Sequence, residues 1–166
     1  VMIAAIGVVV SGLLGTTLGV VAGYLRGKVD FVISRLIDAQ LSIPFMLLAI
    51  ALIVARGQSL TILILVLVTF GWAEYARIVR SEVLSLRERP WVTALRLGGI
   101  PSFQIVARHI TPNVMNTVLV IATLQVGGMV LGEGGLSFLG LGVVSPNISW
   151  GLMLAEGRAH FTTSWW

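Results

Sequence analysis

Few side chains in this 166-residue sequence are of the types that catalyse reactions or bind metal ions. There is no cysteine, which excludes disulfides, thiolate metal ligands and cysteine nucleophiles. The sequence has two histidines, His109 and His160. The distribution of basic residues, described below, predicts that they lie on opposite sides of a membrane, so they cannot share a metal ion. We therefore predict no metal site and interpret each histidine as a surface or interface residue.

Two common catalytic motifs are incomplete in the sequence. A phosphate-binding P-loop has the pattern Gly-x-x-x-x-Gly-Lys followed by Ser or Thr. The only lysine, Lys28, precedes Val29, and Ala22 stands where the first glycine would be. A nucleophile elbow needs Gly-x-Ser-x-Gly, but Leu139 follows residues 135–138 where the closing glycine would stand. We predict no catalytic residues and no cofactor, so the chain itself is expected not to be an enzyme.

One carboxylate, Asp38, lies within a largely apolar segment. An acid inside a membrane span is a functional candidate, because a charge in lipid is unfavourable. Asp38 stands near the end of its segment, and Arg35 precedes it by three residues. That spacing brings the two side chains onto one helix face. A local ion pair is therefore favoured over a role in transport.

The composition places the chain in a membrane. Apolar residues make up 57% of the sequence and charged residues 11%, whereas soluble domains carry about 25% charged residues. The formal net charge is +4, and a basic balance can indicate nucleic-acid binding. Here the basic residues gather beside apolar segments, which the positive-inside rule explains better. We predict contact with membrane lipid and none with nucleic acid.

Four segments are long enough to cross a bilayer, which takes roughly 20 apolar residues. We expect an all-α fold, a polytopic transmembrane bundle forming one domain, with Pro44 and Pro112 as kinks because proline removes a backbone hydrogen bond. Gly15, Gly19 and Gly23 repeat at a four-residue spacing, which predicts a face that packs closely on another helix. The predicted spans cover residues of about 1–25, 36–55, 60–80 and 102–131.

The distribution of lysine and arginine predicts the topology. Nine basic residues lie in the segments 26–35 and 77–108, and two, Arg56 and Arg158, lie on the opposite side. The more basic side is expected in the cytoplasm. Residues 81–101 are therefore predicted to form a cytoplasmic loop, and residues 132–166 an external region that either faces a partner or caps the helix ends.

The cytoplasmic loop contains a short segment with the signals of a helix. Pro90 suits a first helical turn, and Gly98 and Gly99 can adopt the left-handed conformation that ends a helix. One face of this helix carries residues at positions i, i+3, i+4 and i+7, namely Trp91, Ala94, Leu95 and Gly98. The pattern is typical of a helix held by another protein. A helical cytoplasmic loop without a partner is the alternative.

This block resembles the EAA loop of the membrane subunits of bacterial ABC importers, whose motif is Glu-Ala-Ala, three residues, Gly, nine residues, then Ile-x-Leu-Pro. Thr93-Ala94-Leu95 stands where Glu-Ala-Ala would be, Gly99 is the motif glycine and Pro112 the motif proline. Thr93, Leu95 and Thr111 depart from the motif, which leaves the detail of a docking contact open. Nearby and later segments resemble the dipeptide, oligopeptide and nickel branch, at residues 85–89, 108–110, 136–142 and 149–151.

The resemblance implies a permease subunit in the bacterial cytoplasmic membrane that carries di- or oligopeptides, with nickel as a less favoured substrate. It implies two membrane subunits as a heterodimer, two ABC ATPase subunits and an extracytoplasmic substrate-binding protein. Ala94 and Gly99 would allow close approach of an ATPase. Trp91 and Leu95 would supply apolar contact, and Arg87, Arg89 and Arg96 would pair with acids around its groove.

Two other classes of function remain as alternatives. A secondary transporter driven by an ion gradient would need paired charges or broken spans near the midplane, for which Asp38 is the single candidate. A structural membrane scaffold explains the glycine face, but it does not explain a short amphipathic helix bounded by proline and glycine in the cytoplasm. Both ends of the sequence are apolar or interfacial, so we expect further spans before Val1 and after Trp166.

Overall fold

A computed structural model describes residues 2–142, 148–160 and 163 of the chain. Every regular element in these ranges is helical, which confirms the all-α prediction. Parts of the external region expected at 132–166, namely 143–147, 161–162 and 164–166, lie outside the described residues. The elements are α1 (Met2–Leu25), α2 (Gly27–Ser42), α3 (Phe45–Arg56), α4 (Leu60–Arg87), α5 (Pro90–Leu97), α6 (Ser102–Ile105), a π-helical segment (Val106–Ile110), α7 (Thr111–Phe138) and α8 (Trp150–His160).

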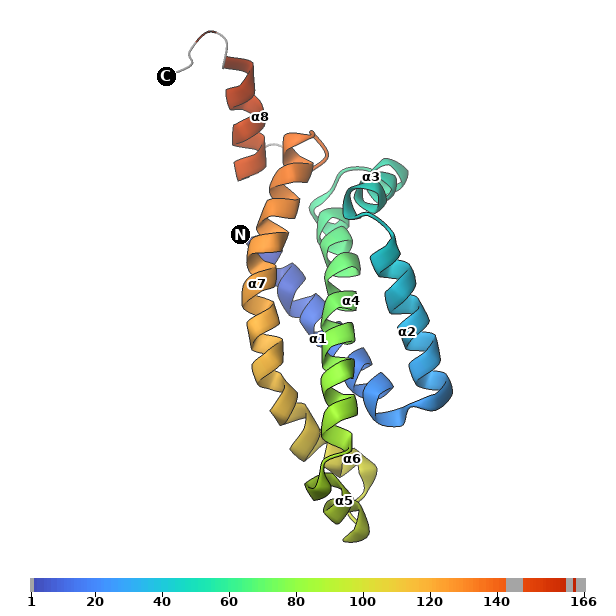
Figure 1. Cartoon of the computed structure of the whole chain (residues 1–166). Helices are drawn as coiled ribbons and strands as arrows, with labels where there is room; N and C mark the ends of the chain where they lie inside the picture. The colour runs from blue at the N-terminus through green and yellow to red at the C-terminus, as the bar shows by residue number, and fades with distance from the viewer. Residues whose placement is uncertain (1, 143–147, 161–162, 164–166) are drawn as a thin grey trace.

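Within the described residues, three helices are long and apolar enough to cross a membrane. They are α1, α4 and the continuous helix Ser102–Phe138, which joins α6, the π-helical segment and α7. Figure 1 shows α4 at the centre, α7 on one side of it and α2 on the other, with α1 crossing behind. Helices α5 and α6 lie at one end of this bundle, and α3 and α8 lie at the other.

The segment expected as a single span at 36–55 is instead two helices. α2 and α3 meet at 89° across a short break, so together they form a fourth, broken span or a re-entrant loop. Two consecutive extended residues, Ile43 and Pro44, separate them. Proline disfavours a helical conformation at the residue before it, so the break is much sharper than the kink predicted for Pro44. α2 also begins at Gly27, inside the expected polar connection 26–35.

The most extensive helix packing in the described structure joins α1 to α4. A Cβ atom added at Gly15 would lie 2.3 Å from the carbonyl oxygen of Trp72, and one at Gly19 would lie 2.8 Å from that of Ala76. At Gly23 the added atom would lie 2.8 Å from Cβ of Val83. The absence of side chains at these three positions lets the two backbones approach closely, which strengthens van der Waals contact between helices in lipid.

Charged residues link α2 to α4. Asp38 accepts a hydrogen bond from Nη2 of Arg77 at 2.8 Å, and its other oxygen lies 3.9 Å from Nη1 of Arg35. Asp30 accepts one from Nη2 of Arg80 at 2.8 Å. The ion pair expected between Asp38 and Arg35 is therefore the longer of two contacts. The shorter one connects helices that are remote in the sequence, which fits a structural role for this acid.

Candidate coupling helix at the end of the bundle

The short helix α5 covers Pro90–Leu97. These are the bounds that the proline at its start and the two glycines after its end predict. Pro90 occupies the first turn, and Arg89 before it is extended. At the other end Gly99 has a φ of 76°, while Gly98 has a φ of −73°. The left-handed conformation expected for both glycines is thus adopted by Gly99 alone.

Two hydrogen bonds close the end of α5. The N–H of Ile100 donates to the carbonyl of Leu95 at 3.2 Å, and the N–H of Gly99 donates to that of Arg96 at 3.0 Å. This pair of bonds forms a Schellman motif, which satisfies carbonyls that the helix end would leave unpaired. The chain is therefore turned sharply toward Pro101 and α6 by local interactions.

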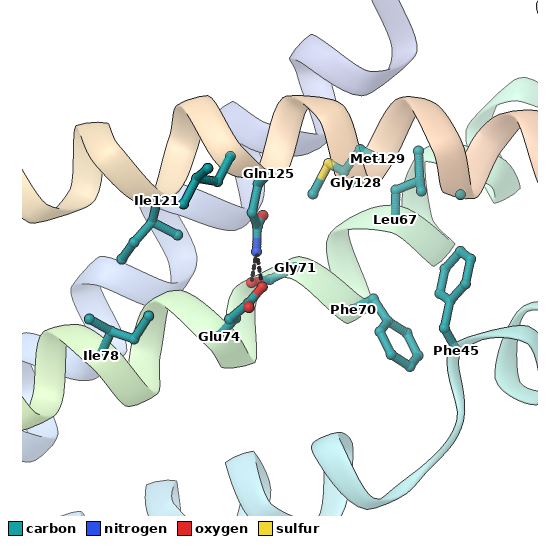
Figure 2. Close-up of a pocket in the computed structure, with 12 residues that line it drawn as sticks. Phe45, Leu67, Phe70, Gly71, Glu74, Ile78, Ile121, Gln125, Gly128 and Met129 are labelled. Atoms are coloured by element: carbon teal, nitrogen blue, oxygen red, sulfur yellow. Dashed lines mark hydrogen bonds between the residues drawn. The ribbon is translucent and has the colours of Figure 1, made fainter.

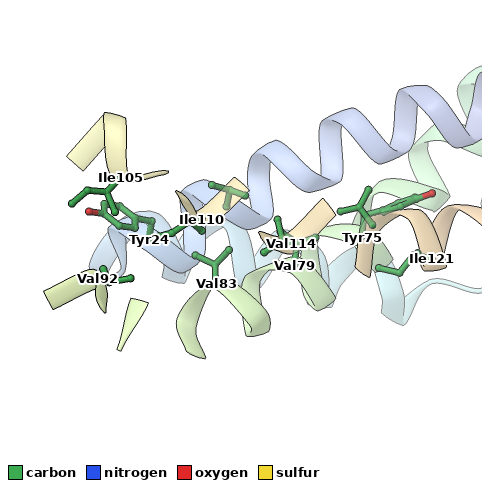
Figure 3. Close-up of a cluster of buried hydrophobic side chains, with 11 residues drawn as sticks. Tyr24, Tyr75, Val79, Val83, Val92, Ile105, Ile110, Val114 and Ile121 are labelled. Atoms are coloured by element: carbon green, nitrogen blue, oxygen red, sulfur yellow. The ribbon is translucent and has the colours of Figure 1, made fainter. Parts of the chain in front are cut away.

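One face of α5 is packed into the bundle. Val92 is fully buried, and Trp91 and Leu95 are half-buried against the same cluster of apolar side chains. This cluster, shown in Figure 3, draws residues from α1, α4, α5, α6, the π-helical segment and α7. The Trp91 ring also lies 6.3 Å, between centroids, from the ring of His109. Trp91 and Leu95 therefore pack against the bundle of their own chain and keep part of each side chain exposed, and their apolar contact with a partner stays a prediction.

The opposite face of α5 is exposed. It carries Thr93, Ala94 and Arg96, and the turn after it exposes Gly98 and Gly99. Two large apolar side chains next to these residues are strongly exposed, Leu97 at 85% and Phe103 at 84%. Neither Leu97 nor Phe103 is among the residues that the sequence pattern predicts for the docking face. Leu97 follows Ala94 by three residues, so helical spacing could have placed it on this face.

The arginines around α5 make contacts within the chain. Arg87 donates a hydrogen bond to the carbonyl oxygen of Tyr24. The guanidinium groups of Arg87 and Arg96 each lie 5.4 Å from the centroid of the Tyr24 ring, close enough for cation–π attraction. Glu88 pairs with Arg26 at the end of α1. Of the three arginines expected to face a partner, two thus contact Tyr24, while Arg89 is exposed.

Pro112 lies at the start of α7, directly after the π-helical segment. The N–H of Thr111 donates to the carbonyl of Val106, five residues earlier. Proline has no N–H and so cannot donate the next hydrogen bond of a regular helix. π-helical turns inside long helices are frequent at functional sites. Pro112 therefore marks the place where the helix that follows the α5 loop changes its winding as it enters the span.

No group of three or more His, Asp or Glu side chains that could hold a metal ion occurs among the residues that the structure describes. What α5 offers is a rigid, exposed helix face at the end of a membrane bundle, anchored by Val92 and the Tyr24 contacts. Such a face can bind another protein, as an exposed helix does when it lies in a groove.

Comparison with known proteins places this arrangement in a family. Residues 15–164 match the family model of binding-protein-dependent transport system inner membrane components. The oligopeptide transport system permease protein OppC of Haemophilus influenzae is 39% identical over 160 residues, which are 96% of this chain and 51% of that protein. The dipeptide transport system permease protein DppC of Bacillus subtilis is 37% identical over 155 residues, 93% of this chain and 48% of that protein.

A third relative, OppC of Escherichia coli, is 41% identical over 140 residues, 84% of this chain and 46% of that protein. The chain thus spans about half the length of the curated relatives that it matches. The family match covers most of the sequence, including α5 and every span from the end of α1 onward. The chain is a multi-pass membrane protein and belongs to the binding-protein-dependent transport system inner membrane components.

Proposed function

We propose that this chain is part of a permease subunit of an ATP-driven importer of di- or oligopeptides, working in the bacterial cytoplasmic membrane. The substrate class is taken from the printed names of the relatives, which are oligopeptide and dipeptide permeases. Nickel, the other substrate of the branch that the sequence resembles, has no support from these names.

The observation that carries the proposal is the position of α5. It stands at the end of the bundle, outside the spans, with one face packed inward and the other exposed. We propose that the exposed face, with Ala94 and Gly99 at its centre and Leu97 and Phe103 beside it, docks in a groove on an ATPase subunit. Residues 81–101 would then be cytoplasmic and the described part of 132–166 external.

Coupling would follow from rigidity. Movement of an ATPase on binding ATP would pull α5, and its anchors Val92 and Tyr24 would pass the displacement to α4 and α1. Packed helices move as bodies rather than deforming continuously, so the spans would rock between inward and outward access. The remaining partners in the proposal are a second permease subunit, forming a heterodimer, and an extracytoplasmic substrate-binding protein.

The test uses proteoliposomes that contain the full-length subunit together with the proteins encoded by the neighbouring genes. We expect the subunit to co-purify with an ATPase subunit, and uptake of a labelled dipeptide to require ATP and binding protein. Uptake that needs no ATP and stops when an ionophore collapses the ion gradients would indicate a secondary transporter instead. Stable association with membrane proteins and no uptake under any condition would indicate a scaffold.

A further inference from the structure

A pocket of about 380 Å³ opens between α4 and α7, inside the spans. Figure 2 shows its lining, which is mostly apolar. Glycines at 71, 128 and 132 contribute no side chain to it. Two polar side chains interrupt the apolar lining, Glu74 from α4 and Gln125 from α7. Small-molecule sites commonly have this make-up, a largely apolar hollow with a few polar groups.

Glu74 and Gln125 contact each other across the pocket. Nε2 of Gln125 donates to Oε2 of Glu74 at 2.8 Å and to the carbonyl oxygen of Gly71 at 3.3 Å. Gln125 is only 8% exposed, and its Oε1 is buried without a hydrogen-bond partner in the described structure. None of the ion pairs within the described residues involves Glu74. Among the described residues the carboxylate therefore has one neutral donor and no cation within ion-pair distance.

The exposed position of Glu74 restricts what can cover the pocket. Glu74 belongs to α4, a helix long and apolar enough to cross a membrane, and its side chain is exposed in this chain. An ionised carboxylate against lipid tails is strongly unfavourable, and acids in spans face a bundle interior or a water-filled cavity. This preference favours a location of the α4–α7 face at Glu74 away from lipid.

The broken span reaches the same pocket. Phe45, the first residue of α3 after the break at Ile43 and Pro44, lines it beside Phe70 of α4. The two rings pack edge to face with their centroids 4.8 Å apart. Non-helical backbone at membrane depth is tolerated where protein buries it or where it lines a cavity. In transporters, interrupted spans commonly border the path of the substrate.

We propose that this pocket is a segment of an aqueous translocation pathway, and that Glu74 receives an ammonium group of the passing solute, such as the amino terminus of a peptide. Gln125 is a positioning residue that holds the carboxylate toward the cavity. This proposal rests on the proposed permease function and adds a ligand chemistry and a residue to it.

The test uses the full-length subunit in its complete complex, reconstituted in proteoliposomes. The sequence has no cysteine of its own, so single cysteines can be introduced and labelled, with any native cysteine elsewhere in the complex removed. Leu124 and Leu119 form a matched pair on α7, because they are 73% and 63% exposed but only Leu124 lines the pocket. We expect Leu124→Cys to react with trimethylammonium-ethyl methanethiosulfonate about tenfold or more faster than Leu119→Cys, because thiolates form and react in water rather than in lipid.

The charge of Glu74 is tested in the Leu124→Cys background. Glu74→Gln should slow the cationic reagent several-fold and speed the anionic reagent sulfonatoethyl methanethiosulfonate, since it removes the local negative potential. Glu156→Gln, which removes an exposed carboxylate on α8, should change neither rate. In uptake assays Glu74→Gln should lower transport of a labelled tripeptide about tenfold, and Glu74→Asp should retain most of it.

The outcomes separate this proposal from the proposed function. Lack of reaction at both cysteines would overturn the aqueous pathway, because lipid or a partner subunit would then cover the pocket. Reaction at Leu124→Cys with no dependence on Glu74 would overturn ammonium recognition. If the proposed permease function is wrong, the unmodified complex will take up peptide without requiring ATP. That result does not depend on the labelling pattern. Binding-protein-stimulated ATP hydrolysis that persists in Glu74→Gln, while tripeptide uptake falls, is the result that supports the proposal.

Discussion

At the scale of single residues, glycine decides how closely α1 and α4 approach. Gly15 and Gly19 face carbonyl groups of α4 with no room for a side chain. Gly127 on α7 would place an added Cβ in open space. Because lipid supplies no hydrophobic force between helices, this close contact contributes directly to stability.

We expect Gly15→Ala to destabilise the bundle by about 1–3 kcal/mol, because its methyl group must displace the backbone of Trp72. Gly127→Ala is the matched control. It should be neutral or slightly stabilising, since alanine favours a helix by about 1 kcal/mol over glycine. Thermal unfolding in detergent measures both variants. Equal midpoints for Gly15→Ala and the unmodified chain would mean that α1 and α4 can separate without loss.

At the scale of elements, α5 depends on contacts that come from the far end of α1. The Tyr24 ring lies against Arg87 before α5 and Arg96 within it. Tyr24 is also part of the buried cluster that holds Val92. Its hydroxyl group is buried without a hydrogen-bond partner in the described structure. The ring is therefore the part of the side chain that holds the arginines, beside the backbone carbonyl that accepts from Arg87.

Tyr24→Ala should therefore loosen α5, with a loss of about 3–5 kcal/mol typical of removing a buried aromatic ring. Tyr24→Phe keeps the ring and should leave α5 unchanged. Hydrogen exchange of the amides at 91–97 measures the effect, with the amides of α3 as an internal control for general unfolding. Unchanged exchange at 91–97 in Tyr24→Ala would mean that α1 does not position α5.

The elements differ in how far the sequence predicts them. The bounds of α5 follow from Pro90 and Gly99, because capping is a local property of the chain. The inward turn of Trp91 depends instead on contacts with residues far away in the sequence. Helical spacing grouped Trp91 and Leu95 with Ala94 on one face, but the packing covers Trp91 and Leu95 and leaves Ala94 exposed. For the same reason, the spacing could not tell which side of the helix would be buried.

The break between α2 and α3 and the pairing of Glu74 with Gln125 also escaped prediction. A single proline is compatible with a mild kink or with a full break, and the extended conformation of Ile43 decides between them. Glu74 and Gln125 are 51 residues apart and meet only through the packing of α4 against α7. No local pattern marks either side chain as part of a pocket.

At the scale of the whole molecule, the two ends of the bundle differ in charge. The junction of α1 and α2, which carries Arg26 and Lys28, lies toward the end that holds α5 and α6. Arg26 pairs there with Glu88, next to the arginines around α5. Arg56 and Arg158 belong to α3 and α8 at the opposite end. This asymmetry supports a cytoplasmic location for α5 under the positive-inside rule.

Cysteine labelling of the full-length protein tests this orientation. We expect Ser59→Cys, between α3 and α4, to react with an impermeant thiol reagent in intact spheroplasts. Glu88→Cys should react only after the membrane is opened. Each change removes one exposed contact, a helix cap at Ser59 and an ion pair at Glu88, at a cost of about 1 kcal/mol or less. Labelling of Glu88→Cys in intact spheroplasts would reverse the topology.

We propose that the exposed face of α5 transmits the action of an ATPase to the spans. Ala94→Arg places a long charged side chain on that face without touching the buried side of the helix. An unpaired charge in a docking interface costs about 3–5 kcal/mol. Gly157→Arg is the control, since Gly157 is exposed in α8 with open space around it at the other end of the molecule.

The most direct measurement is ATPase co-purification together with peptide uptake for Ala94→Arg in the full-length subunit, at matched abundance in the membrane. We expect ATPase recovery and uptake both to fall at least about tenfold in Ala94→Arg, while Gly157→Arg keeps both. Normal recovery and normal uptake in Ala94→Arg would mean that α5 is an ordinary loop that does not couple the ATPase to the spans.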